Sequence, residues 1–226
     1  MNLFKTYDLY CERTSPDFWA EPVNALTNIC FLIAAWFGWR QVKKLNADSR
    51  GTRLLLVLIC CIGVGSFLFH TFATLWARLL DVLPILLLQL AYTWLYFRKI
   101  IHIRFPPTAA FVAGYLAFVL IVRQAVTNHP DILNSSWIYA PAMMLILALA
   151  IYHAVTHRHK RYVMAGATGI FALSLTFRST DLMVCRSFPL GTHFMWHILN
   201  PIVFYMMLLG LTANIEADNR ESDTDI

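Results

Sequence analysis

Residues 53–70 have the sequence RLLLVLICCIGVGSFLFH, and no charged residue lies between Arg53 and His70. A helix needs about 17–25 mostly apolar residues to cross the roughly 30 Å hydrocarbon core of a bilayer. The apolar run at 54–74 therefore predicts a transmembrane helix. Ser66 and His70 lie in this run, and polar groups inside a membrane are costly and commonly mark function.

Six further apolar runs of suitable length lie on either side of this one. They span residues 22–40, 79–97, 107–126, 136–156, 162–182 and 191–213. The composition agrees, because 58% of the 226 residues are hydrophobic and 14% are charged, whereas soluble domains usually carry about 25% charged residues. We therefore predict an all-α fold, a polytopic membrane protein built as a bundle of seven transmembrane helices.

The chain is predicted to form one domain, residues 1–215, followed by a short tail. The tail at 216–226 is acidic and has no aromatic residue, which predicts disorder. The net charge is +5, but no basic patch is interleaved with aromatic residues. Nucleic acid is therefore not an expected partner.

Lys and Arg set the predicted orientation, because short cytoplasmic loops carry an excess of them. Eleven of the eighteen Lys and Arg residues fall in the first, third and fifth loops: Arg40, Lys43, Lys44, Arg50, Arg53, Arg98, Lys99, Arg104, Arg158, Lys160 and Arg161. The N-terminus is therefore predicted to lie outside and the C-terminus in the cytoplasm. The lack of a long targeting extension favours a bacterial inner membrane, with an internal eukaryotic membrane as the alternative.

Two pairs of side chains have the spacing of one helical turn. His193 and His197 are four residues apart, and so are Ser66 and His70. Residues four apart share one face of a helix. Two imidazoles so placed can bind one metal ion, and neutral imidazole suits zinc.

The predicted topology places the polar groups at one membrane depth, near the non-cytoplasmic side. The groups at this depth are Glu21, Asn24, Ser66, His70, Asp81, His193 and His197. A catalytic zinc has three protein ligands and an open position for water. Three histidines together with an aspartate therefore favour a metal site over scattered polar residues.

Each feature also has a structural interpretation. A single intramembrane histidine is more often an interhelical hydrogen-bonding group, Asp81 could be a buried polar anchor, and Ser66 could pack between helices. Arg178 and Asp181 are three residues apart on a helix, and we interpret them as a structural ion pair. Three aromatic residues near helix ends are interpreted as an interfacial belt: Tyr10, Trp19 and Trp196.

At these residues the sequence resembles the alkaline ceramidase family. That family is part of a superfamily of seven-helix membrane hydrolases that includes the adiponectin-type receptors. The matching pieces are YCER at 10–13, FWAEPVNALTN at 18–28, SFLFH at 66–70, DVLP at 81–84 and THFMWH at 192–197, followed by Asn200. The resemblance implies an enzyme of sphingolipid metabolism that hydrolyses the linear amide C–N bond of ceramide, releasing a fatty acid and a sphingoid base.

Carried over to this chain, the resemblance implies a zinc ion held by His70, His193 and His197. Ser66 and Asp81 would contact the zinc-bound water. Asp81 is then the expected general base. The Ser66 hydroxyl is the expected donor to the oxyanion of the tetrahedral intermediate. The acyl chain of the lipid would stay in an apolar tunnel within the bundle.

The resemblance also implies a calcium site built from the N-terminal segment. Glu12 and Glu21 match its pattern, and Asp17 or Asp8 would have to supply further ligands. Other positions that hold ligand-type residues in the family are replaced: Leu9, Tyr10 and Thr14. Calcium is therefore only weakly supported.

A disulfide between the N-terminal segment and the outer end of the sixth helix is a further implication of the resemblance. Cys11 and Cys185 fit this pairing, and the predicted topology places both on the outer, oxidising side. Cys30, Cys60 and Cys61 lie in apolar runs. They are interpreted as packing residues.

Three other functions are consistent with the same residues. A receptor or sensor could bind lipid at the zinc site with little turnover, or the hydrolase could act on another lipid amide or an ester. A proton-coupled transporter would use the ionisable groups as a relay, but these groups cluster at one depth and do not cross the membrane. Metal content and product formation distinguish these alternatives. The sequence does not predict an oligomeric state.

Overall fold

The structure, a computed structural model, describes residues 2–129 and 132–224, and its regular structure there is helical. The helices are α1 Pro22–Thr27, α2 Ile29–Lys44, α3 Arg50–Phe72, α4 Leu75–Lys99, α5 Phe105–Asn128, the 3-10 helix η1 Ile132–Tyr139, α6 Ala140–Val155, α7 Val163–Val184 and α8 Phe194–Thr224. Within the described ranges the only β-type pairing is an isolated bridge between Thr6 and Thr74. The all-helical fold predicted from the sequence is confirmed.

Six segments among the described residues are long and apolar enough to cross a membrane. They are Pro22–Lys44, Arg50–Phe72, Leu75–Lys99, Phe105–Asn128, Ile132–Val155 and Phe194–Arg220. Helix α7 has 22 residues and is long enough, but Arg178, Asp181 and several hydroxyl side chains make it more polar. These six helices indicate a multi-pass membrane protein. A seventh span at α7 stays a prediction.

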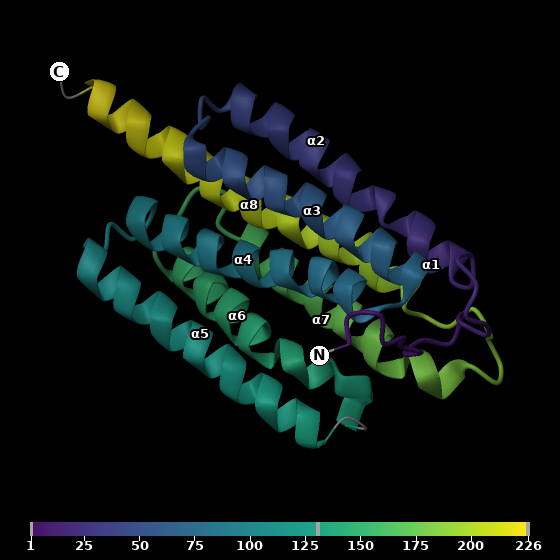
Figure 1. Cartoon of the computed structure of the whole chain (residues 1–226). Helices are drawn as coiled ribbons and strands as arrows, with labels where there is room; N and C mark the ends of the chain where they lie inside the picture. The colour runs from purple at the N-terminus through teal and green to yellow at the C-terminus, as the bar shows by residue number, and fades with distance from the viewer. Residues whose placement is uncertain (1, 130–131, 225–226) are drawn as a thin grey trace.

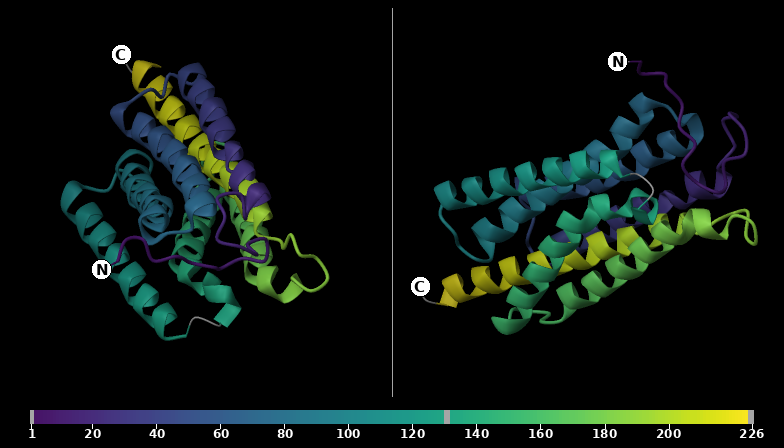
Figure 2. Two further views of the ribbon diagram at one scale, coloured as in Figure 1. Left: turned by 45° about the vertical axis from the view of Figure 1, so that its right-hand side comes forward. Right: turned by 90° about the horizontal axis from the view of Figure 1, so that it is seen from below.

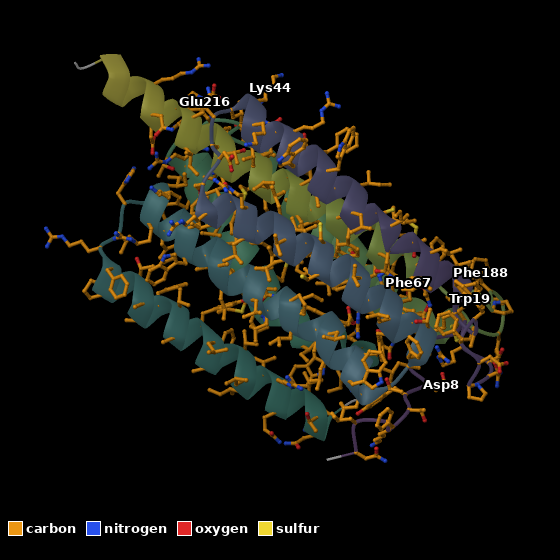
Figure 3. All side chains as sticks on the ribbon, turned by 45° about the horizontal axis from the view of Figure 1, so that its top comes forward. Asp8, Trp19, Lys44, Phe67, Phe188 and Glu216 are labelled. Carbon is orange, nitrogen blue, oxygen red and sulfur yellow. A yellow bond between two sulfur atoms is a disulfide. The ribbon has the colours of Figure 1, made fainter. Side chains whose placement is uncertain are left out.

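The long helices lie side by side along one general direction, and α8 packs against α7 and α2 (Figures 1 and 2). The N-terminal segment, residues 2–21, lies at the end of the bundle where α3 ends and α8 begins. Asp8, Trp19 and Phe188 lie at this end, whereas Lys44 and Glu216 lie at the other (Figure 3). We call these the N-terminal end and the C-terminal end of the bundle.

Helix α3 has a defined start and stop. Ser49 begins it with a capping box, in which its hydroxyl accepts a hydrogen bond from the Thr52 amide at 3.2 Å. Ala73 ends it in the left-handed region, at φ 49°. The chain then reverses into α4, and the Thr6–Thr74 bridge joins this reversal to the N-terminal segment.

Helices α3 and α4 approach each other closely at Gly65. A Cβ added there would lie 2.0 Å from the Leu80 carbonyl oxygen and 3.0 Å from the Asp81 amide nitrogen. Only glycine allows a backbone contact this close. The contact brings Ser66 on α3 into register with Asp81 on α4.

The C-terminal part of α8 corrects one prediction. Residues 216–224 continue the helix to Thr224, whereas the sequence predicted disorder from 216 onward. Glu216 and Arg220, four residues apart, form an ion pair at 2.6 Å, and such pairs stabilise an exposed helix. Asp218 also lies 3.2 Å from His102 Nε2. Residues 225–226 of the predicted tail lie outside the described residues.

Candidate metal centre

Three buried histidines meet at the N-terminal end of the bundle. His70 comes from the last turn of α3, and His193 and His197 come from the start of α8. Their ring centroids lie 4.7 to 5.3 Å apart. One nitrogen from each ring lies within 4.8 Å of the others. The structure therefore brings together the three histidines that the resemblance implied as zinc ligands.

The hydrogen bonding of these rings fits a metal ion. Within the part of the chain that the structure describes, His193 Nδ1 and both ring nitrogens of His197 are buried without a hydrogen-bond partner. A buried polar atom without a partner costs about 1–3 kcal/mol. Burial of an imidazole disfavours its charged form, so these buried rings are expected to be neutral. Neutral imidazoles with free nitrogens are the ligands that zinc prefers.

Glu21 orients the third ligand. Its Oε2 lies 2.6 Å from His70 Nδ1 and accepts a hydrogen bond from Asn24 Nδ2 at 3.1 Å. Burial alone would raise the pKa of Glu21, but the His70 imidazole and the Arg13 guanidinium lower it below its ordinary value. An ionised carboxylate on Nδ1 leaves Nε2 free for a metal, as in carboxylate–histidine–zinc arrangements.

Asp181 positions the start of α8 and does not pair with Arg178. Its Oδ1 accepts hydrogen bonds from the amides of Thr192 at 2.7 Å and His193 at 2.9 Å. Among the described residues, Arg178 donates instead to Ser136 Oγ at 2.7 Å. The predicted ion pair is therefore wrong, because the Asp181 carboxylate is taken up by the backbone of the α7–α8 connection.

Glycine is required in this connection. Gly191 has φ +68°, and a Cβ there would lie 2.2 Å from Asp181 Oδ1. A side chain would be strained in this conformation and would also displace the carboxylate. Gly191 therefore lets Asp181 reach the two amides that lead into His193.

The N-terminal segment is fastened across the histidines. Cys11 and Cys185 form a disulfide, with a Cα–Cα distance of 5.3 Å. The Cys11 amide donates to Asp181 Oδ2 at 3.0 Å. Next to it, the Tyr10 ring stacks on His193 with centroids 3.6 Å apart and planes 11° apart. The disulfide implied by the resemblance is thus present, and it holds Tyr10 over a metal-ligand candidate.

Two of the three predicted belt aromatics are buried. Tyr10 is 8% exposed and Trp196 is 7% exposed, whereas Trp19 is 55% exposed. Trp196 packs on Tyr139 with ring centroids 4.7 Å apart. The interfacial interpretation is therefore wrong for Tyr10 and Trp196, because helix-end position alone does not distinguish a lipid-facing ring from one that faces the site.

An apolar cavity leads away from the histidines. It has a volume of about 70 Å³, well below the roughly 300–1,000 Å³ of typical ligand pockets. Ser66, Asp81 and Asn200 line it, and the rest of the wall is mainly apolar. On α3 the wall extends back to Leu55, about 16 Å along the helix axis. Because Ser66 lies one turn before His70, the cavity reaches the edge of the metal centre.

The candidate calcium ligands are not gathered around a shared position. Glu12 accepts the amides of Val23 at 2.7 Å and Asn24 at 2.8 Å, at the start of α1. The Asp17 carboxylate accepts from its neighbour Ser15 at 2.8 Å. Glu21 binds the guanidinium of Arg13 at 2.5 Å. The three carboxylates therefore do not fit a calcium site.

His153 provides an internal reference at the C-terminal end. Its Nδ1 lies 2.8 Å from the Tyr96 hydroxyl, and its Nε2 lies 2.9 Å from the His159 carbonyl. Both ring nitrogens have protein partners, so His153 is a structural histidine. The sequence placed it near the inner surface, away from the candidate metal centre.

The ceramidase family model matches residues 9–225, nearly the whole chain. The chain belongs to the ceramidase family. Membership implies a membrane hydrolase that acts on an amide bond of a lipid. Among curated proteins, none matches the chain.

Sequence reasoning missed two residues that this ceramidase-family chain places at the metal centre. Arg13 pairs with Glu21, and Tyr10 covers His193. A signal for Arg13 was present, because a carboxylate expected at the depth of the histidines needs a neighbouring cation. No sequence signal distinguished Tyr10 from an interfacial aromatic residue.

Proposed function

We propose that this protein is a zinc-dependent intramembrane hydrolase that cleaves ceramide into a sphingoid base and a fatty acid. The observation that carries the proposal is the trio of buried histidines, two of which have unpaired ring nitrogens, one helical turn from an apolar cavity. Membership of the ceramidase family supports the amide as the bond that is cleaved.

His70, His193 and His197 would hold the zinc. Bound there, zinc would act as a Lewis acid that polarises the scissile carbonyl and makes water more acidic. The protein prepares these ligands in advance, because Glu21 orients His70 and Asp181 fixes the backbone at His193. Such partners of metal ligands commonly affect metal affinity by about 10–100-fold.

Asp81 is the proposed general base. Its carboxylate lines the cavity, and the imidazole of His70 and the guanidinium groups of Arg178 and Arg78 lie near it. In this position it would take a proton from the attacking water and deliver it to the nitrogen of the leaving amine. Ser66, on the facing helix, would donate its hydroxyl hydrogen to the oxygen of the scissile carbonyl as negative charge develops there.

The cavity would receive part of the acyl chain of the lipid. Its wall is mainly apolar, and Ser66, Asp81 and Asn200 lie on the side nearest the histidines, whereas Gln89 lines it farther along α4. A lipid amide fits this division, because its chain is apolar and its single amide is polar. The same arrangement would accommodate another lipid amide or an ester, so the assay below includes both.

We also propose seven membrane spans, with the N-terminal end of the bundle on the non-cytoplasmic side of a bacterial inner membrane. Two features support this orientation: the Lys and Arg residues gather in the loops of the C-terminal end, and the disulfide lies at the N-terminal end. Disulfides persist on the oxidising side of a membrane. A fluorescent protein fused to the C-terminus should fluoresce, because it folds in the cytoplasm.

The first experiment combines metal analysis with lipid hydrolysis. Purified wild-type protein is expected to carry about one zinc per chain, since its three ligands leave one open position. The His193→Ala/His197→Ala double variant should carry none. Asp81→Asn should keep its zinc and lose about 10²–10⁴-fold in ceramide hydrolysis, while the exposed Asp8→Asn on the same end should keep its activity.

Each failure has a distinct meaning. A folded wild-type protein without zinc, even after metal is resupplied, would refute the hydrolase mechanism. Normal turnover by Asp81→Asn would refute the assignment of the base. Bound zinc with no product from ceramides, other lipid amides or esters would favour a lipid receptor.

A further inference from the structure

Arg13 is a buried cation at the N-terminal end, with 7% of its surface exposed. Its Nε lies 2.5 Å from Glu21 Oε1, and its Nη2 donates to the His70 carbonyl at 2.9 Å. Nη1 donates to the carbonyls of Ser15 at 3.2 Å and Asp17 at 3.5 Å. One carboxylate and three backbone carbonyls therefore surround the guanidinium. We call these four oxygens the cage.

The chemistry of this cage is that of a hard-cation site. Carboxylate and carbonyl oxygens are the ligands that calcium takes in proteins, and here all four oxygens face the guanidinium of Arg13. A guanidinium is always charged and presents five N–H donors in a fixed plane. It therefore satisfies several oxygens at once and supplies the positive charge that Glu21 requires.

The cage is joined to the metal centre through a closed ring of contacts. Arg13 binds the Glu21 carboxylate and also the His70 carbonyl. Glu21 in turn binds His70 Nδ1. Arg13 thus restrains both the main chain of His70 and the carboxylate that orients its ring.

Among the described residues, the candidate carboxylates Glu12, Asp17 and Glu21 leave no ligand set for a second cation at this position. Glu12 is bound to the amides at the start of α1, and the Asp17 carboxylate is bound to Ser15. Glu21 has the guanidinium on one oxygen and His70 with Asn24 on the other. Calcium would have to displace Arg13, a buried charge already paired.

We propose that Arg13 is a positioning residue of the metal centre, whose guanidinium serves as the built-in cation of the N-terminal segment. It holds Glu21 on His70, so that the three histidines assemble without calcium. This inference rests on the proposed zinc site for its link to metal affinity, whereas the claim that Arg13 replaces calcium stands on the cage alone.

The test for positioning compares substitutions of two arginines at the same end. Arg13→Ala is expected to raise the dissociation constant for zinc by about 10–100-fold. The exposed Arg186→Ala should leave it unchanged. Arg13→Lys restores the charge without the planar fork, so it should give an intermediate constant, and it carries the test if Arg13→Ala does not fold. When Co²⁺ replaces zinc, its visible absorption spectrum reports the arrangement of the ligands. This spectrum should change in Arg13→Lys and not in Arg186→Ala.

The test for calcium uses the wild-type protein in detergent. Radioactive Ca²⁺ should not bind at millimolar concentration, the range of weak extracellular calcium modules, and the melting temperature should not rise. Stoichiometric Ca²⁺ binding that disappears in Glu21→Gln would overturn the replacement of calcium by Arg13. Wild-type zinc affinity and an unchanged Co²⁺ spectrum in Arg13→Lys would overturn positioning. A wild-type protein without zinc would refute the proposed function, while the calcium measurement would still decide the nature of the cage.

Discussion

Buried histidines lie at both ends of the bundle, and they differ in what their ring nitrogens contact. At the C-terminal end, His153 has a protein partner on each nitrogen. At the N-terminal end, His197 has no partner on either nitrogen among residues 2–129 and 132–224, and His193 lacks one there on Nδ1. The comparison shows that burial of a histidine does not by itself indicate a metal ligand. A free nitrogen in a buried ring does.

The two ends also differ in how they are held together. At the C-terminal end, Asn214 joins α8 to the α6–α7 connection, accepting from the His159 amide at 3.0 Å and donating to its carbonyl at 3.2 Å. At the N-terminal end, the Cys11–Cys185 disulfide and the Asp181 carboxylate tie the N-terminal segment to α7 and α8. The end with the candidate metal centre therefore carries the stronger restraint.

The largest expected effect tests the difference between His197, a candidate metal ligand, and His153, a structural histidine. His197→Ala should remove the zinc that co-purifies with the chain, because it deletes one of three protein ligands. His153→Ala should keep the zinc and lower the free energy of unfolding by about 1–3 kcal/mol, because it leaves the Tyr96 hydroxyl without its partner and the His159 carbonyl with Asn214 alone. Elemental analysis and thermal melting of both variants check this. Equal zinc loss in both variants would mean that hydrogen bonding does not distinguish metal-ligand histidines from structural ones.

The next effect compares the restraints at the two ends. Cys11→Ser should lower the free energy of unfolding by about 2–5 kcal/mol, because it opens a disulfide that links residues 174 apart. Tyr96→Phe at the other end should cost about 1 kcal/mol, the value of one hydrogen bond. Melting under non-reducing conditions measures both, and a reducing agent should shift only proteins that keep the disulfide. An unchanged melting point for Cys11→Ser would contradict the view that the N-terminal end carries the stronger restraint.

A third prediction compares the two ends of α3. Gly65→Ala should cost about 1–3 kcal/mol and reduce hydrolysis, because its Cβ would meet the Leu80 backbone at 2.0 Å and push Asp81 from Ser66. Gly51→Ala should cost less, since its Cβ would meet only the movable end of the Leu95 side chain at 2.5 Å. Melting and turnover of the two variants decide the point. A more severe defect in Gly51→Ala would place the critical helix contact at the other end.

The smallest effect concerns pH at the C-terminal end. A hydrogen bond from Lys43 and the nearby Arg53 lower the pKa of Asp48 below its ordinary value. A lowered pKa stabilises the folded state at pH values above the unfolded-state pKa, and this stabilisation is lost as pH falls through the folded-state pKa. Asp48→Asn should therefore reduce the melting temperature slightly at neutral pH and not in acid, where Asp48 is protonated. A larger difference in acid than at neutral pH would reverse this sign.

Much of the architecture was accessible from one sequence because the bilayer imposes strict length and polarity requirements. The run at 54–74 appears in the structure as α3, and most of the run at 191–213 falls in α8, which begins at Phe194 and continues to Thr224. The helical end was missed because composition reports the lack of apolar residues and not ion pairs such as Glu216–Arg220. A seventh span at α7 stays a prediction, because polar side chains that face the site also lower the hydropathy of the helix.

The candidate site was predictable where spacing along one helix decides the geometry. His193 and His197 share a face because they are four residues apart, and the structure adds His70 from another helix to the same cluster. Spacing misled the interpretation of Arg178 and Asp181, since residues three apart on one helix can still turn to different neighbours. The resemblance supplied the pairing of Cys11 with Cys185, which no local pattern contains.

The sequence by itself determined a helical membrane protein with histidines, an aspartate and a serine at one depth, because helix period and hydropathy are local properties. Only the tertiary structure decided which buried nitrogens are free and which are paired, since hydrogen-bond partners come from segments far apart in the chain. Arg13 illustrates the difference. Its place in the sequence is a polar N-terminal segment, and only folding surrounds it with the oxygens of Glu21, Ser15, Asp17 and His70.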